Sequence, residues 1–194
     1  MNGSYVPLLR RRREGVTDYR SRRKAITSNS PLLVVRISNK NVSCQFVKPT
    51  VKGDVVVTSA HSKELSKLGW KGSLKSTPAC YLLGLLAGRK ALKQGVKEAV
   101  VYMGLAPFIN GSRTAAFLKG VVDAGVEVPV GEDVFPSEER LSGKSIAEYA
   151  EQLSKDDEDA YKARFSAMLK SGFKPEEYPS QFDKTKAAVM EAKV

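Results

Sequence analysis

Four consecutive arginines stand near the start of the chain: Arg10, Arg11, Arg12 and Arg13. Four more basic residues follow shortly after them: Arg20, Arg22, Arg23 and Lys24. Such a density of positive charge cannot be buried in a hydrophobic core, so this stretch is solvated or bound to a polyanion. Arginine suits phosphate because its planar guanidinium donates two parallel hydrogen bonds, and the flanking Tyr5 and Tyr19 offer faces for base stacking. We predict an RNA-binding arm; the alternative is a disordered, solubilising terminus.

Charge is divided unevenly along the 194 residues. Residues 1–130 hold 22 Lys and Arg against 7 Asp and Glu, a net charge of +15, whereas residues 131–194 hold 10 against 14, a net charge of −4. A polyanionic partner is therefore expected to contact the first two-thirds of the chain. The apolar fraction of 42% is enough for one packed domain with an appendage.

The cysteine and histidine content excludes several classes of site. Cys44, Cys80 and the single histidine, His61, are too few for a structural zinc site, which takes four ligands. We expect both cysteines to be small buried side chains. The sequence shows no signal peptide and no apolar run close to the roughly 18–20 residues of a membrane span. The chain is therefore predicted to be cytoplasmic, with no membrane contact, no metal, no cofactor and no small-molecule substrate.

No catalytic set is recognisable. His61 adjoins Ser62, but a nucleophilic pair also needs an orienting carboxylate and an oxyanion site. A phosphate-binding loop of the Walker type is missing. A metal-dependent nuclease needs clustered carboxylates, and those of the first 130 residues are scattered: Glu14, Asp18, Asp54, Glu64, Glu98, Asp123 and Glu127. We predict that the chain is not an enzyme and keep a nuclease only as an unfavoured alternative.

Three strand-like runs follow the arm, at residues 32–39, 42–48 and 55–60. Asn39–Asn41 and Gly53–Asp54 have the composition of the connecting turns. The middle run alternates between apolar and polar residues. The pattern predicts an antiparallel meander with one apolar face and one mixed face, and Arg36 and Gln45 are expected on the mixed face.

Helices and strands then alternate. A helix is predicted from Pro78, with Thr77 as its N-cap and Gly95 as its end, and it carries no charge over residues 79–88. A strand at residues 98–105, a helix capped by Ser112 and a short strand at residues 126–130 follow. This order predicts a layered α/β fold in which crossovers bring the later strands to the sheet.

The composition changes after residue 131. One long amphipathic helix is predicted at residues 145–173 and a weaker one at residues 183–193, without strands. We therefore divide the chain into a basic arm (1–30), an α/β domain (31–131) and an acidic helical extension (132–194). Whether the extension meets RNA or protein stays open, although its net charge of −4 favours protein or solvent.

Further basic residues lie where helices are expected to begin. Lys71 and Lys75 precede the uncharged helix, and Arg113 starts the next one. The free N–H groups at a helix N-terminus favour phosphate. Zinc fingers, basic zippers and helix-turn-helix patterns are missing, and an extended basic arm beside a sheet suits folded RNA better than a DNA groove.

Several motifs, in order, resemble one family. RRRREGVTDYRSRRKAI, LLVVRISNKNVSCQFV, GDVVVTSAHSKEL, GWKGSLKSTPACYLLGLLAGRKAL and GSRTAAFLKGVVDAGVEVPVGEDVFPSEERLSG are similar to the 5S rRNA-binding protein of the large ribosomal subunit, the universal L-eighteen family, over about residues 5–150. The longer acidic C-terminus resembles the archaeal branch. The resemblance implies a ribonuclease-H-like α/β fold, a three-layer domain with a mixed sheet, without catalysis. It also implies 5S rRNA, large-subunit rRNA and neighbouring large-subunit proteins as partners, in the central protuberance of the cytoplasmic ribosome.

The resemblance also implies site residues. The arm residues that match the family's RNA-contacting motif are Arg10, Arg11, Arg12, Arg13, Tyr19, Arg20, Arg22 and Arg23. Those that match its sheet edge and turn are Arg36, Ser38, Asn39 and Lys40, and those that match its loop before the long helix are Trp70, Lys71 and Lys75. The chain departs from the pattern at Tyr102, where the family often has Asp, and at Ser76, where it often has Asn. An RNA-binding module that acts outside the ribosome remains the main alternative.

Overall fold

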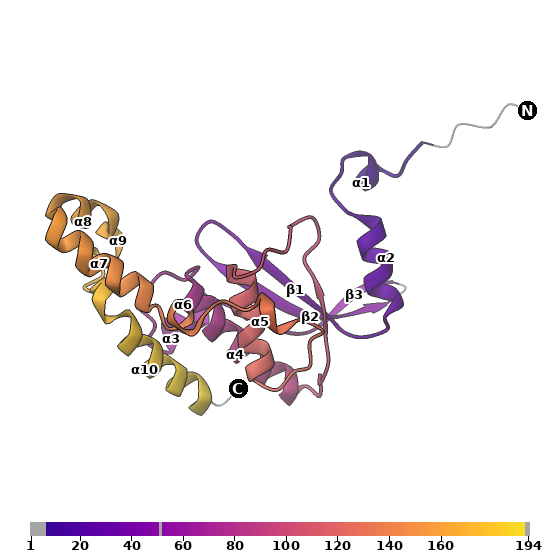
Figure 1. Cartoon of the computed structure of the whole chain (residues 1–194). Coiled ribbons are helices and arrows are strands. Elements are labelled where there is room, and N and C mark those ends of the chain that lie inside the picture. The colour runs from indigo at the N-terminus through magenta and orange to yellow at the C-terminus, as the bar shows by residue number, and fades with distance from the viewer. Residues whose placement is uncertain (1–6, 51, 193–194) are drawn as a thin grey trace, which may run out of the picture.

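The computed structural model describes residues 7–50 and 52–192. Figure 1 shows a central sheet flanked by helices, with the N-terminal arm at one end of the molecule and a group of C-terminal helices at the other. The strands are β1 (Leu32–Ile37), β2 (Val42–Thr50), β3 (Gly53–His61) and β4 (Val100–Tyr102). This confirms the predicted α/β class with a mixed sheet, three layers and a helical C-terminal extension.

Helices make up most of the remaining chain. Before β4 they are α1 (Arg10–Arg13), α2 (Tyr19–Thr27), α3 (Lys63–Lys67) and α4 (Thr77–Lys93). After β4 they are α5 (Arg113–Asp123), α6 (Glu138–Ser142), α7 (Lys144–Asp156), α8 (Glu158–Arg164), α9 (Ser166–Lys170) and α10 (Tyr178–Glu191), with short 3₁₀ turns at Glu132–Val134 and Pro175–Glu177.

The sheet has the strand order β3-β2-β1-β4. β2 pairs antiparallel with β1 and β3, whereas β4 pairs parallel with β1, so α3 and α4 form the crossover between the two parts. The predicted hairpin turn at Asn39–Asn41 is confirmed, with the Ser38 N–H donating to the Asn41 carbonyl at 2.8 Å. The predicted turn at Gly53–Asp54 is wrong. Both residues belong to β3, because Gly53 already pairs with Thr50.

The two faces of the sheet are covered differently. On one face, apolar side chains pack with α4 and α5 into the main core, and these include Leu33, Val35, Val42, Cys44 and Phe46. On the other face, Leu32 and Tyr102 pack with Ala25 from α2. The layers are therefore α2, the sheet, and the α4–α5 pair. Arg36 and Gln45 are exposed and lie at strand positions in phase with Leu32, as predicted for the mixed face.

Helix α4 is the centre of the main core. Its residues from Pro78 to Gly88 are all buried, as their lack of charge predicts. The N-cap is Ser76, whose Oγ accepts a hydrogen bond from the Ala79 N–H at 3.4 Å, so the predicted Thr77 cap is wrong by one residue. Ser is at least as good a cap as Thr. Gly84 lets α5 approach so closely that an added Cβ would overlap the Phe117 carbonyl.

Two other predictions are corrected. The expected strand at residues 126–130 is only an isolated bridge between Glu98 and Glu127, because the pairing is not continued past Val128 and Pro129 has no N–H to donate. The expected long helix at residues 145–173 is divided into α7, α8 and α9. The Asp157 carboxylate caps a new helix by accepting two backbone N–H groups at 3.0 Å.

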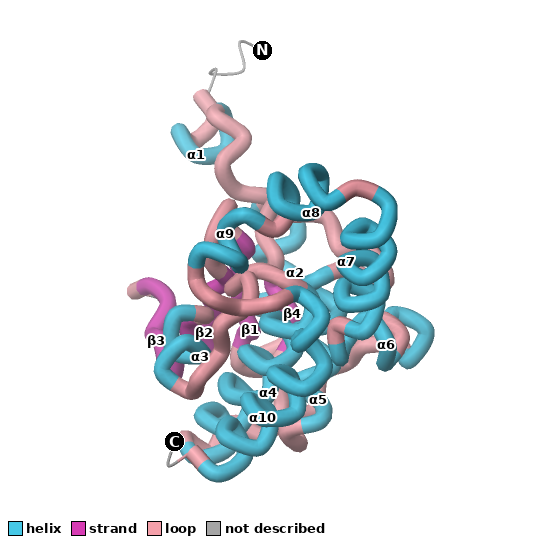
Figure 2. The backbone as a smooth tube through the Cα atoms, turned by 90° about the vertical axis from the view of Figure 1, so that its left-hand side faces the viewer, coloured by secondary structure: helices cyan, strands magenta, loops and turns pink. Residues whose placement is uncertain are grey.

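The C-terminal extension completes the core rather than trailing from it. Tyr178, Phe182 and Val189 of α10 are buried in the same cluster as α4. The Tyr178 ring packs edge-on against Trp70, with centroids 5.6 Å apart, and its hydroxyl accepts the Ser73 N–H at 3.0 Å. Helix α10 packs against α4, and Figure 2 shows the two helices close together.

Candidate RNA interface

The arm is helical over much of its length, not extended. Arg10–Arg13 form a single turn, α1, and all four side chains are exposed. Asp18 begins α2 by accepting hydrogen bonds from the Arg20 and Ser21 N–H groups. The guanidinium of Arg11 donates to Thr17 Oγ1 at 2.9 Å, which fixes the bend between the two helices. Tyr5, the other predicted stacking residue, lies outside the described residues.

Arg22 attaches the arm to the sheet. Its guanidinium pairs with the Asp54 carboxylate of β3 and lies over the Tyr102 ring of β4, 5.3 Å from the centroid. Arg22 is also half-buried, whereas Arg20, Arg23 and Lys24 are exposed. Arg22 therefore orients α2 and is less available to RNA than its neighbours. Nothing in the sequence pairs it with Asp54, 32 residues away.

A basic cleft lies between the arm and the sheet. Its volume is about 570 Å³, and it is lined by Arg11, Tyr19, Arg22 and Arg36 together with the loop Met103–Ala106. Arg36 holds that loop, because its guanidinium donates to the Met103 carbonyl at 2.8 Å. The remaining donors of Arg36 and the exposed guanidinium of Arg11 can hold phosphate oxygens, and Tyr19, 40% exposed, can stack on a base.

The other predicted residues fall into separate groups. Arg23 and Lys24 line a shallow hollow with Thr27 and Ser28 on α2. Ser38, Asn39 and Lys40 are exposed in the β1–β2 turn, where the Ser38 hydroxyl donates to the Asn41 carbonyl at 2.9 Å. Lys71 and Lys75 are exposed before α4, and Arg113 is exposed at the first position of α5. The cleft thus gathers only part of the predicted set.

Trp70 was predicted to contact RNA, but the structure places it in the core as a packing residue. Its side chain is only 3% exposed, and its indole N–H donates to the Ser73 carbonyl at 3.3 Å. A covered ring cannot stack on a base. The sequence could not show this, because the aromatic partner that covers it, Tyr178, lies 108 positions later.

The pair His61 and Ser62 is structural. Ser62 is fully buried, and its Oγ accepts the Val42 N–H at 3.1 Å, while His61 Nδ1 accepts the Lys63 N–H at 3.1 Å. Burial raises the pKa of the Cys44 and Cys80 thiols to about 12, so neither forms the thiolate that nucleophilic chemistry needs. Both cysteines are the small buried residues that we predict.

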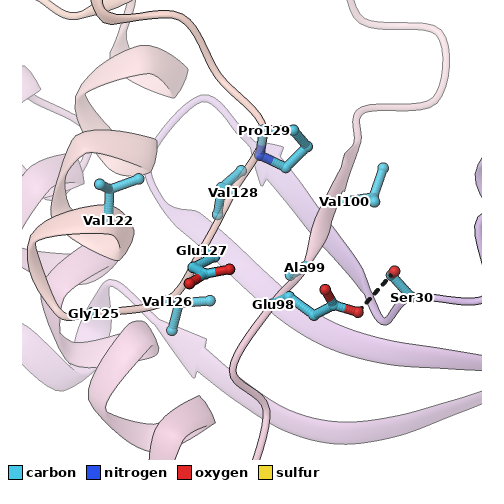
Figure 3. Close-up of a pocket in the computed structure, with 10 residues that line it drawn as sticks. All are labelled: Ser30, Glu98, Ala99, Val100, Val122, Gly125, Val126, Glu127, Val128 and Pro129. Atoms are coloured by element: carbon cyan, nitrogen blue, oxygen red, sulfur yellow. Dashed lines mark hydrogen bonds between the residues drawn. The ribbon is translucent and has the colours of Figure 1, made fainter.

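Another cavity is lined by two glutamates and does not suit RNA. It measures about 650 Å³ and lies beside the bridge between Glu98 and Glu127, with Ser30 Oγ 3.1 Å from Glu98 Oε1 (Figure 3). The sequence does not reveal that the backbones of these two glutamates lie side by side. Within residues 7–50 and 52–192, no three His, Cys, Asp or Glu side chains are grouped as metal ligands. In that same part of the chain no helix could span a bilayer.

Comparison with known proteins decides the family. The family model described as "Ribosomal large subunit proteins 60S L5, and 50S L18" matches residues 5–103, a range that holds the arm, α4 and all four strands. The chain belongs to this family. It is therefore a structural protein of the large ribosomal subunit and not an enzyme, and its place is the ribosome, in the cytoplasm. This confirms the ribosomal prediction over the nuclease.

Similar proteins from archaea span nearly the whole chain. The protein named "Large ribosomal subunit protein uL18" of Thermofilum pendens is 50% identical over 184 residues, 95% of this chain and 94% of its own length. Proteins of the same name from Methanothermobacter thermautotrophicus and Methanococcus maripaludis are 47% and 46% identical. They cover 96% and 98% of this chain, and the same shares of their own lengths are matched. The similarity therefore includes the C-terminal extension.

Proposed function

We propose that the chain binds 5S rRNA through its arm and the basic cleft, and that it attaches this RNA to the large-subunit rRNA in the central protuberance. The observation that carries the proposal is the convergence of Arg11, Arg36 and Tyr19 on one cleft. The two guanidinium groups suit the phosphates of structured RNA, and the exposed tyrosine ring suits an unpaired base. The exposed arginines of α1 lie next to them.

The mechanism is charge neutralisation combined with recognition of RNA shape. The side chains proposed to meet 5S rRNA are Arg10, Arg11, Arg12, Arg13, Tyr19, Arg20, Arg23, Lys24, Arg36, Ser38, Asn39 and Lys40, with Arg22 holding α2 in place. We expect roughly six to ten of them to meet phosphates. Each such contact makes the slope of log affinity against log salt concentration more negative by about 0.7–0.9. Lys71, Lys75 and Arg113 are proposed to meet the adjoining rRNA.

A gel-shift titration against transcribed 5S rRNA at two salt concentrations tests the proposal. A variant without residues 1–24 should lose most of its affinity and most of its salt dependence. The paired substitution Arg11→Gln and Arg36→Gln should lower the salt slope by about two. Its matched control is Lys170→Gln with Lys184→Gln, which removes the same charge from exposed positions of the C-terminal extension. Undiminished binding by the truncated variant would refute the arm's role.

A further inference from the structure

A second basic pocket lies within the acidic extension. It measures about 360 Å³ and is formed by the first residue of α4 and by helices α6, α7 and α8. The lining residues are Thr77, Arg140, Ser145, Ile146, Tyr149, Arg164 and Phe165. Two of them are arginines and none is a carboxylate. The pocket is thus locally positive although residues 131–194 carry a net charge of −4.

The two arginines differ from the lysines around them. Lys144 lies 3.8 Å from Glu148, and Lys162 lies 2.7 Å from Glu158. In the parts of the chain that the structure describes, no ion pair or hydrogen bond engages Arg140 or Arg164, and both are exposed. A guanidinium without a carboxylate partner keeps its paired donors for an external anion.

The pocket adjoins another basic group. The guanidinium of Arg140 lies beside Gly111, 3.8 Å from where its Cβ would be, just before the Ser112 cap of α5. The exposed Arg113 that follows is the first residue of α5. Arg140 thus lines the pocket and also lies next to the start of α5, where Arg113 adds a third arginine.

An aromatic face completes the pocket. Tyr149 is 47% exposed, and its ring meets the buried Phe165 at an angle of 61° with centroids 6.3 Å apart. This contact fixes one edge of the ring and leaves the rest accessible. Arginine and tyrosine together are the residue types that hold a phosphate and stack on its base.

We propose that Arg140, Arg164 and Tyr149 bind a segment of the large-subunit rRNA, separate from the RNA held by the arm. This inference rests on the proposed function. Helices α7 and α8, which carry Tyr149 and Arg164, lie at the end of the molecule opposite α1 in Figure 1, and Figure 2 also shows them apart from α1. The protein thereby joins two RNA segments across its body.

The test measures the two RNAs separately. The double variant Arg140→Gln/Arg164→Gln is titrated with transcribed 5S rRNA, and its complex with 5S rRNA is then titrated with transcribed large-subunit rRNA. The matched control, Lys144→Gln/Lys162→Gln, removes the same charge from lysines that are already paired. We expect unchanged 5S binding, a loss of roughly tenfold or more in the second step, and a salt slope for that step lower by about two.

A crosslinking experiment decides between RNA and protein as the occupant. A photoreactive phenylalanine replaces Tyr149, and ribosomes assembled with this variant are irradiated. Crosslinks to large-subunit rRNA support the proposal, whereas crosslinks only to a ribosomal protein overturn it, as does equal behaviour of the two double variants in the titration. If the unaltered protein fails to bind 5S rRNA in the first step, the function proposed for the arm fails instead.

Discussion

The two ends of this chain are both helical, yet they are attached to the domain in different ways. Of the arm residues that the structure describes, Ala25 alone is buried, in a small cluster, and most of the others are exposed. The C-terminal helix α10 places Tyr178, Phe182 and Val189 in the main core. The first terminus therefore presents exposed positive charge, which is why we propose it as the RNA ligand, whereas the second is a packing element. Helical form alone says little about the role of a terminal segment.

The difference arises from what each helix can bury. Residues 19–27 include four basic residues, with Ala25 and Ile26 as the only aliphatic ones, so α2 can cover only a small apolar surface. α10 carries large apolar residues toward α4. This contrast should appear in the free energy of unfolding of variants at the two ends of the chain.

Tyr178→Ala should cost about 3–5 kcal/mol of unfolding free energy, as for other buried aromatic residues truncated to alanine. The ring is fully buried between Trp70 and Phe173, and its hydroxyl accepts the Ser73 N–H. Urea denaturation measures the loss. Met190→Ala is the control on the same helix, because Met190 is 55% exposed. Similar losses for both variants would mean that α10 is not a packing element.

Gly84→Ala should cost about 1–3 kcal/mol, because overpacked positions force the neighbouring backbone apart. The added methyl group would overlap the Phe117 carbonyl of α5. This substitution lies in the α/β domain, to which both terminal segments are attached. Gly131→Ala is the control, since an added Cβ there meets no atom within 4 Å. Thermal unfolding of the two variants should separate them by several degrees; equal midpoints would contradict the close approach of α4 and α5.

Arg22→Gln should cost about 1 kcal/mol or less, because a partly exposed ion pair and one cation–π contact are weak. The effect should instead appear locally, as faster amide hydrogen exchange in residues 20–27. Arg23→Gln, from the exposed side of the same helix, should leave exchange unchanged. If the two variants exchange alike, Arg22 does not hold the arm and is as available to RNA as its neighbours.

Replacing Arg10, Arg11, Arg12 and Arg13 by lysine should change the unfolding free energy by less than about 0.5 kcal/mol, as for other exposed positions. Affinity for 5S rRNA should still fall, because lysine keeps the charge but loses the planar donor pair. The salt slope should stay close to that of the unaltered protein, since the number of cations is the same. Unaltered affinity would show that only charge matters at these four positions.

Local signals in the sequence predicted much of the fold. The uncharged run after Pro78 identified a buried helix, and the Ser112 hydroxyl, which accepts the Ala115 N–H at 3.4 Å, marked the start of α5. These features depend on neighbouring residues only. The strand expected at residues 126–130 failed because its length depends on pairing with a distant segment, and that pairing is limited to one bridge.

The site was less predictable, for the same reason. The arginines at residues 10–13 indicate RNA binding without any knowledge of the fold. The cleft, in contrast, forms only because Arg36 and the loop after β4 lie next to the arm. Trp70 was expected to contact RNA because it matches the family's loop before the long helix, and that match does not show that Tyr178 covers its ring. Arg140 and Arg164 were not predicted as site residues, because the segment around them has a net negative charge.

The contact between Tyr178 and Ser73 has a consequence for synthesis of the protein. It joins residues 105 positions apart, so the core cannot close until the last helix has left the peptide exit tunnel. Because domains fold from the N-terminus as they are made, at about 5–20 residues per second, the arm is exposed to solvent several seconds earlier. A nascent chain could thus engage its RNA before its own domain is complete.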